Sequence, residues 1–256
     1  MNKILILARH TIKELLRKKD FYILIILFAG LAAFFYSETF FGIKDISRYL
    51  KDIGLSLVSF FSLIITISFS AKQIPAEIES KTIYPLLAKP VSRTQFILGK
   101  FVGSLFISVI SFSAFYCLYL IFILSKGEHT SLILLAQYYW LSLLLLALLS
   151  SFAILFSLFL TISANIAISF SLYFFMFWYN EALRKILVLA SGKLTYLYSL
   201  LYYILPHFEF YDLRIRLIHL WEPLPLWTIT AISIYTVLYT GLIIWITSML
   251  FKRKSL

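Results

Sequence analysis

Four histidines and a single cysteine are the side chains of this sequence best suited to bind a metal ion. The histidines are His10, His129, His207 and His219, and none of them stands at a spacing typical of metal ligands. We interpret them as isolated histidines in loops or at interfaces. Cys117 lies in an apolar run and is interpreted as a small buried side chain. The sequence predicts neither a metal site nor a cofactor bound by this chain.

Patterns for nucleotide binding and catalysis do not occur either. Gly99 and Lys100 are followed by Phe101 and lack an upstream glycine at the spacing of a phosphate-binding loop. The sequence has no G-x-S-x-G nucleophile pattern. Its long apolar stretches contain no Asp, Glu, Lys or Arg, which disfavours an ion-coupled carrier. The chain is therefore not expected to be an enzyme or to bind ATP itself.

The segment 74–100 combines acidic, basic and apolar residues that suit contact with a protein partner. Pro75 can open a helix that has Glu77 and Glu79 in its first turn, where acidic side chains are favourable. Glu77 and Lys81 have the i, i+4 spacing of an ion pair on one helix.

A second short helix is expected around residues 85–88, ending before the next proline. Leu86 and Leu87 would be exposed at its tip, with Lys89 and Arg93 around them. An apolar tip in charged surroundings suits docking to another protein. The alternative is an ordinary basic loop packed under the membrane helices.

A second charged cluster stands near residue 212 and contains Glu209, Asp212, Arg214 and Arg216. It is expected to face away from the cytoplasm, as part of an exit gate or as a contact for an extracytoplasmic partner protein. The alternative is a solvated interface loop. The gate candidates are Pro206, Phe208, Glu209, Asp212 and Arg214.

The composition places these segments on a membrane protein. Hydrophobic residues make up 61% of the 256 residues and charged residues 14%, against about 25% charged in soluble domains. These values exclude a soluble domain and intrinsic disorder. The sequence thus predicts an all-α polytopic membrane protein, a single transmembrane domain over residues 1–256.

Six spanning helices are expected. Three lie at 21–37, 53–71 and 101–125, two share the run 130–180, and the last is 223–251. The run 130–180 has 51 residues without a charge, about 77 Å of helix, which is more than twice the apolar thickness of a bilayer. We therefore expect a tight turn beside residue 159.

The charge distribution predicts the topology. Segments 1–20, 72–100 and 252–256 together carry a net charge of +10, and the rest of the chain carries +1. The positive-inside rule places the first group, including both termini, in the cytoplasm. Residues 181–222 are then extracytoplasmic, and the apolar stretch 186–205 within them is interpreted as re-entrant. A seventh span there would export the basic C-terminal tail.

Residues 3–20 have an apolar face and a stripe formed by Arg9, Lys13 and Arg17. This pattern predicts an amphipathic helix on the inner membrane surface, in contact with lipid. The alternative is a basic flank that only fixes the topology.

The docking segment also carries a family resemblance. The run Glu77-x-Glu79-x-x-Thr82-x-x-x-Leu86-Leu87-x-x-Pro90-Val91-Ser92-Arg93, followed by Gly99-Lys100, resembles type 2 ATP-binding-cassette (ABC) exporter permeases. The pattern Leu205-Pro206-x-Phe208-x-x-x-Asp212-Leu213-Arg214 resembles, less specifically, the branch with nitrous-oxide-reductase maturation permeases. Lys81 stands where a glycine is common in the family, and Pro85 where a leucine is common.

The resemblance implies a permease that couples ATP hydrolysis by a separate ATPase subunit to export across the inner membrane. It implies that ATP and Mg²⁺ bind to that ATPase, and that two ATPases pair with two permeases, which are copies or homologues. It also implies that the cytoplasmic segment 72–100 is the coupling region. The ATPase-docking residues would be Glu77, Glu79, Thr82, Leu86, Leu87, Lys89, Pro90, Val91, Ser92 and Arg93. The competing hypothesis is an ATP-independent membrane scaffold or an ion-coupled carrier. No nucleic-acid partner is expected.

Overall fold

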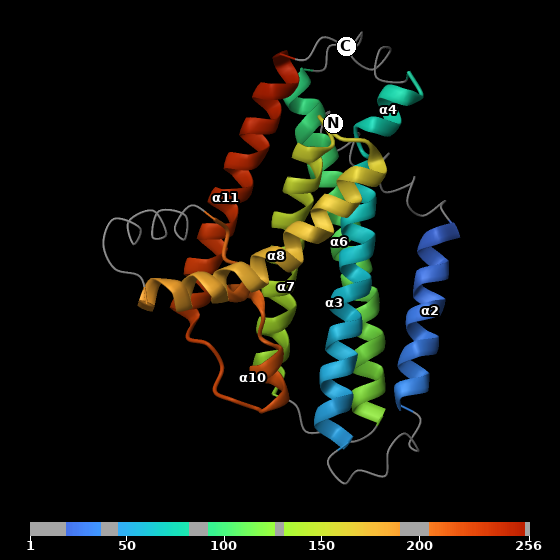
Figure 1. The fold of residues 1–256 in the computed structure, drawn as a ribbon. Helices are drawn as coiled ribbons and strands as arrows, with labels where there is room; N and C mark the ends of the chain where they lie inside the picture. Colours follow the sequence, from blue (N-terminus) through green and yellow to red (C-terminus); the bar gives the residue numbers. More distant parts are fainter. Residues whose placement is uncertain (1–18, 37–45, 82–91, 126–130, 190–204, 254–256) are drawn as a thin grey trace.

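The computed structural model describes residues 19–36, 46–81, 92–125, 131–189 and 205–253, and the described part is built from helices and their connections. Figure 1 shows a bundle whose long helices run roughly side by side. The elements are α2 Lys19–Tyr36, α3 Ile46–Lys72, α4 Pro75–Glu79, α6 Arg93–Ser125, α7 Leu132–Phe156, α8 Ile162–Leu189, η1 Phe208–Tyr211, α10 Arg214–Ile218 and α11 Leu226–Arg253. The predicted all-α architecture is confirmed.

The predicted spans correspond to helices of this bundle. Five described helices are long and apolar enough to cross a membrane: α3 together with α4, then α6, α7, the first part of α8, and α11. The sixth, α2, contains the shorter apolar stretch Tyr22–Phe34. The predicted amphipathic helix at 3–20 falls almost wholly outside the described residues.

Two helices extend beyond the apolar runs that predicted them. Helix α3 begins at Ile46 and α6 at Arg93, whereas the runs begin at Ile53 and Phe101. A run of uncharged residues measures the apolar thickness of the bilayer, not the length of the helix. Polar turns can continue a helix past the apolar layer because their side chains reach water there.

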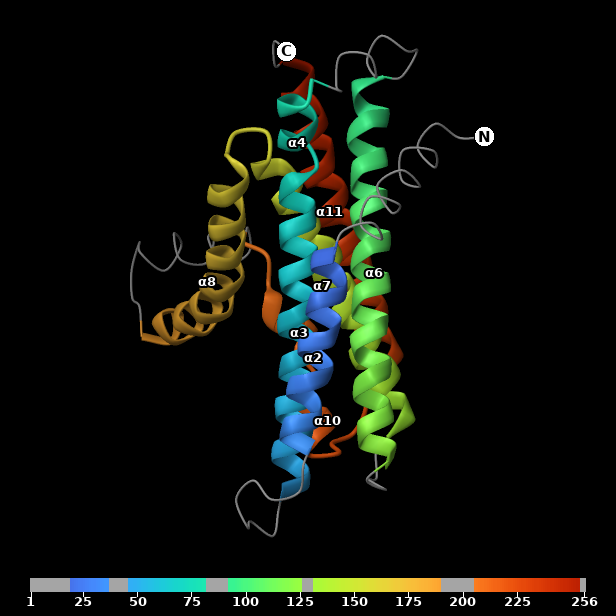
Figure 2. The same cartoon turned by 90° about the vertical axis from the view of Figure 1, so that its right-hand side faces the viewer.

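The predicted turn between the fourth and fifth spans is confirmed. Helix α7 ends at Phe156 and α8 begins at Ile162, on either side of residue 159. Asn165 closes this turn: its Nδ2 donates to the carbonyl of Ala153 at 2.9 Å, and its Oδ1 accepts from Ser169 Oγ at 3.1 Å. Helix α8 then leaves the bundle obliquely, as both views show (Figures 1 and 2), and its described backbone continues past Asn180 to Leu189.

The chain alternates between the two ends of the bundle. Helix α4, the start of α6, the α7–α8 turn and the last turn of α11 lie at one end, and α10 lies toward the other (Figures 1 and 2). We call these the α4 end and the α10 end. The first residue of α2 and the last residue of α11 both lie toward the α4 end (Figure 1).

The buried apolar side chains form two clusters. The larger one extends along the bundle and includes residues of α2, α3, α6, α7, α8, η1, α10 and α11. The smaller one joins the α3–α4 junction to α6, α7 and α11, and we call it the small core. Its members are Ile74, Phe96, Ile97, Ile154, Leu158, Ile244 and Phe251.

Candidate functional site

Helix α4 is five residues long, and the residues at both of its ends explain where it begins and ends. Pro75 occupies its first turn and is buried, and Glu77 is the acidic residue of that turn. At the other end Ser80 Oγ donates to the carbonyl of Ala76 at 2.7 Å. Lys81 follows with a φ of 57°, a left-handed conformation that stops the helix.

The two acidic residues of α4 lie in different environments. Glu79 is exposed. Glu77 forms an ion pair with Lys100 of α6, and these side chains are only 19% and 7% exposed. The helical spacing that predicted a Glu77–Lys81 pair does not apply, because α4 ends at Glu79 and Lys81 lies beyond it.

The start of α6 is held by a capping box. Gln95 N donates to Ser92 Oγ at 3.2 Å, and Ser92 N donates to Gln95 Oε1 at 3.1 Å. Ser92, one of the predicted docking residues, therefore serves as the N-cap of a membrane helix.

Arg93 reaches from this helix start to the end of another helix. Its Nη1 donates to the carbonyl oxygens of Phe251 and Lys252, at 2.9 and 3.0 Å. These are among the last carbonyls of α11, which have no partner within their own helix. The structure thus brings Glu77 and Arg93 into contacts within the chain. The other predicted docking residues, Thr82, Leu86, Leu87, Lys89, Pro90 and Val91, lie outside the described residues, as does the expected helix at 85–88.

At the α10 end, residues 205–222 pack along the bundle. Pro206, Phe208, Tyr211 and Leu217 are buried. The hydroxyl groups of Tyr211 and Thr236 of α11 lie 2.7 Å apart. Burial raises the pKa of the Tyr211 phenol to about 12. The buried apolar side chains of this segment are covered by the bundle, which favours a packed segment over the alternative of a solvated loop.

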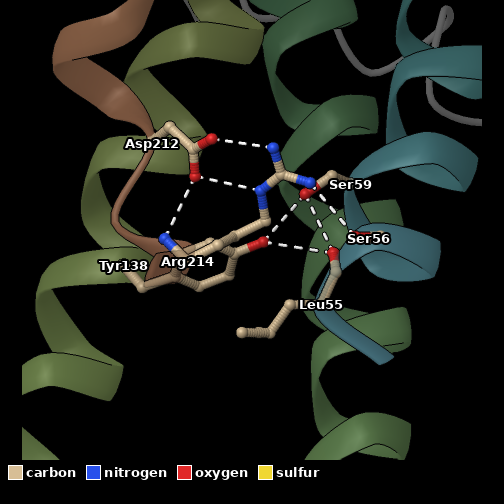
Figure 3. Close-up of polar contacts among 6 residues, drawn as sticks. All are labelled: Leu55, Ser56, Ser59, Tyr138, Asp212 and Arg214. Carbon is tan, nitrogen blue, oxygen red and sulfur yellow. Dashed lines mark hydrogen bonds and ion pairs between the residues drawn. The ribbon is translucent and has the colours of Figure 1, made fainter. Parts of the chain in front are cut away.

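Asp212 and Arg214 form the polar centre of this segment (Figure 3). Asp212 Oδ2 accepts from Arg214 Nη2 at 2.7 Å, and Oδ1 accepts from Arg214 Nε at 2.9 Å and from the Arg214 backbone N–H at 3.0 Å. Arg214 Nη1 donates to Ser56 Oγ of α3 at 3.1 Å. The hydrogen bonds that Arg214 donates to Asp212 raise the pKa of Arg214 further above its usual range. The pair faces the bundle, through the bond from Arg214 to α3. That this segment lies away from the cytoplasm stays a prediction.

A neighbouring contact joins α3 and α7 beside this pair. The hydroxyl groups of Tyr138 and Ser59 lie 2.8 Å apart, as Figure 3 shows. The other charged residues of the predicted cluster are placed differently. Arg216 Nη1 donates to the carbonyl of Glu222 at 3.2 Å in an exposed position, and Glu209 is half-buried. A gate role for this segment stays a prediction.

Metal-binding groups do not gather in the described part of the chain, where no set of three or more His, Cys, Asp or Glu side chains could hold a metal ion. Of the histidines, His207 is buried and His219 is exposed. Burial lowers the pKa of His207 below its usual value. Cys117, expected to be buried, is exposed on α6 because it lies on the outer side of the bundle. In a membrane such an apolar position faces lipid or another protein.

Comparison with known families gives a match over almost the whole chain. The model of the family described as ABC-2 family transporter protein matches residues 5–256. The chain belongs to this family. No curated protein matches it significantly. The ABC-2 assignment confirms the resemblance to type 2 ABC permeases, and the narrower resemblance to the nitrous-oxide-reductase branch stays a prediction.

Several contacts that shape this ABC-2 permease were not predicted from the sequence. The spacing of Ser92 and Gln95 matches a capping box and could have shown that α6 begins before its apolar run. No local pattern could have paired Arg214 with Ser56, or Arg93 with the end of α11, because each pair is separated by about 158 residues. Such contacts depend on how the helices pack.

Proposed function

We propose that this ABC-2 protein is the membrane-spanning subunit of an ABC exporter in the inner membrane, driven by a separate ATPase. The observation that carries the proposal is the family match over residues 5–256 of a helical bundle with several membrane-spanning helices. The chain has no phosphate-binding loop, so its energy source must lie on another subunit. ATP and Mg²⁺ would bind to that subunit.

The α4 end is the proposed ATPase-docking surface. Its supporting features are the exposed Glu79 and the sequence of the adjoining segment, with Leu86, Leu87 and Lys89. The +10 charge of segments 1–20, 72–100 and 252–256 favours a cytoplasmic location for this end. An ATPase in the cytoplasm could then reach it.

Two permeases, copies or homologues, would enclose the substrate path. ATP binding would bring the two ATPases together and change the distance between their docking surfaces. ATP can shift the equilibrium between two conformations of the complex only by the difference between its binding free energies to the two conformations. In this scheme residues 205–222, packed at the α10 end, would border the exit or receive an extracytoplasmic partner protein.

The proposal is tested by purifying the tagged chain from its native membrane after crosslinking. Mass spectrometry should identify a phosphate-loop ATPase in amounts comparable with the permease. The variant Glu79→Lys should reduce the amount of bound ATPase, because it reverses an exposed charge beside the docking segment. Its matched control is Glu222→Lys, an exposed charge reversal toward the α10 end.

If no ATPase accompanies the wild-type chain, an ATP-independent scaffold or ion-coupled carrier becomes the better explanation. If an ATPase is present and Glu79→Lys does not weaken its binding, the assignment of Glu79 to the docking surface is wrong. Equal losses from Glu79→Lys and Glu222→Lys would indicate a general effect of charge reversal on the protein.

A further inference from the structure

Two charged residues of the predicted docking segment are engaged inside the chain. Glu77 pairs with Lys100, and Arg93 binds the end of α11. Both contacts lie at the α4 end, where the small core also joins the α3–α4 junction, α6, α7 and α11. A residue engaged in this way is poorly placed to serve mainly as a contact for another subunit.

Arg93 connects the end of the docking segment to α11. The C-terminus of a helix carries partial negative charge and carbonyl groups without intrahelical partners. Arg93 supplies both a positive charge and donors, to the carbonyls of Phe251 and Lys252. Its guanidinium carbon also lies 5.8 Å from the centroid of the Phe251 ring. The last turn of α11 is thus held by Arg93, the last of the predicted docking residues.

Lys100 connects α4 to the contact between α6 and the end of α11. Besides pairing with Glu77, its Nζ lies 5.7 Å from the centroid of the Phe96 ring. Phe96 in turn stacks on Phe251, with ring centroids 5.5 Å apart and ring planes at 20°. Phe96 and Phe251 are both fully buried. The contacts therefore run without interruption from α4 through α6 to α11.

We propose that Glu77, Lys100, Arg93 and Phe251 are positioning residues that transmit movement of the docking segment to α6 and α11. We call this set the coupling brace. It rests on the proposed function, since it presumes an ATPase bound at the α4 end. Chains of packed side chains and ion pairs between rigid helices can carry energetic coupling between distant sites. Described residues on both sides of 82–91 are engaged: Glu77 with Lys100, and Arg93 with the end of α11.

The test separates transmission from docking. The permease and its ATPase are co-expressed and placed in lipid nanodiscs, with Cys117→Ser and a single reporter cysteine at Trp227→Cys. Trp227 lies in the first turn of α11, is 72% exposed, and is at the opposite end of that helix from Phe251. The labelling rate of the reporter by a membrane-impermeant maleimide is measured with and without ATP, Mg²⁺ and vanadate.

In the wild-type background, nucleotide should change the labelling rate. Arg93→Ala and Lys100→Met should retain the bound ATPase but reduce this change by about fivefold or more, the lower end of typical coupling between sites. Arg93→Lys should restore part of the response, because an ammonium group keeps the charge and the ability to donate to the α11 carbonyls, on a more flexible side chain. The melting temperature of each complex without nucleotide shows whether the variant is folded. If Arg93→Ala melts like Arg93→Lys but responds less to nucleotide, the loss of response is not a loss of folding.

Three results would overturn the coupling brace. Loss of the ATPase from folded Arg93→Ala would make Arg93 a docking contact. A full nucleotide response in Arg93→Ala and Lys100→Met would show that these contacts transmit nothing. A wild-type reporter that does not respond to nucleotide would show that α11 does not move. By contrast, absence of the ATPase from the wild-type complex would contradict the proposed function itself.

Discussion

Some charged side chains of this protein join separate elements of the bundle. Only 14% of its residues are charged, and in the described part of the chain Glu77, Arg93, Lys100 and Arg214 are among those that make such contacts. Charge-assisted hydrogen bonds are stronger than neutral ones, and a partly buried charge is costly without a partner. Removing one member of such a pair should therefore cost more than removing an exposed charge.

Arg214→Ala should lower the free energy of unfolding by about 1–3 kcal/mol, the cost of leaving the half-buried Asp212 carboxylate without its charged partner. The change removes the donors to Asp212 and Ser56. Arg216→Ala is the matched control. Arg216 lies two residues away with an exposed bond to a carbonyl, so its loss should change stability by less than about 0.5 kcal/mol.

The measurement is the melting of both variants in the same detergent. The double variant Asp212→Asn/Arg214→Gln should recover part of the loss, since it leaves no lone charge at the site. Equal melting of Arg214→Ala and Arg216→Ala would contradict the role given to the Asp212–Arg214 pair.

His207 should make the packing of residues 205–222 sensitive to acid. Burial lowers its pKa below 6.5 in the packed state, although nearby Glu209 acts in the opposite direction. Unpacked and solvated, the imidazole has a pKa near 6.5. The packed segment therefore has its full stability above about pH 6.5 and loses stability as the pH falls from there toward the lowered pKa.

Hydrogen exchange of residues 205–222 between pH 8 and pH 5 would show this loss, after correction for the intrinsic pH dependence of exchange. The variant His207→Gln should flatten the curve in that window, because glutamine does not titrate. A wild-type segment with the same opening free energy at pH 8 and pH 5 would show that His207 is not the acid-sensitive group.

At the scale of elements, the sequence predicted the features that composition and length determine. The uncharged run 130–180 required a turn. Residue 159, midway between Trp140 and Trp178, marked a position that falls between α7 and α8. The inward direction of Asp212 and Arg214 could not be predicted. It depends on the position of Ser56 on α3, and one sequence contains no information about which surfaces of distant segments meet.

The end of helix α4 depends on the backbone conformation of one residue, Lys81. Lys81 has a φ of 57°, where a side chain costs about 1–2 kcal/mol and glycine does not. Lys81→Gly should therefore stabilise α4 and its junction by about 1 kcal/mol.

The neighbouring variant Ser80→Gly should have the opposite effect. Ser80 has a φ of −77° and its hydroxyl bonds to the carbonyl of Ala76, so glycine gains no relief there and loses a hydrogen bond. Amide exchange of residues 75–80 measures both variants. Faster exchange in Lys81→Gly than in the wild type would contradict the role given to the left-handed residue.

At the scale of the whole molecule, the charge distribution and the arrangement of the helices indicate the same orientation in the membrane. The ends of α2 and α11 that adjoin the chain termini lie toward the α4 end, as an even number of crossings requires (Figure 1). Most of the net positive charge belongs to segments that begin or end there. The positive-inside rule then gives a direction to a bundle whose helices alone would fit a membrane in either orientation.

Labelling of single cysteines in intact cells checks this direction. In a Cys117→Ser background, Trp221→Cys should react with a membrane-impermeant maleimide, and Ser80→Cys should react only after the cells are opened. Both native side chains are exposed, Ser80 next to α4 and Trp221 after α10, so access to the reagent depends on which side of the membrane each one occupies.

Ser255→Cys, in the basic tail, should behave like Ser80→Cys. External labelling of Ser80→Cys would reverse the orientation of the bundle and remove the docking surface from the reach of a cytoplasmic ATPase. External labelling of Ser255→Cys alone would require an odd number of crossings, and an additional span between residues 186 and 205 would then replace the re-entrant segment.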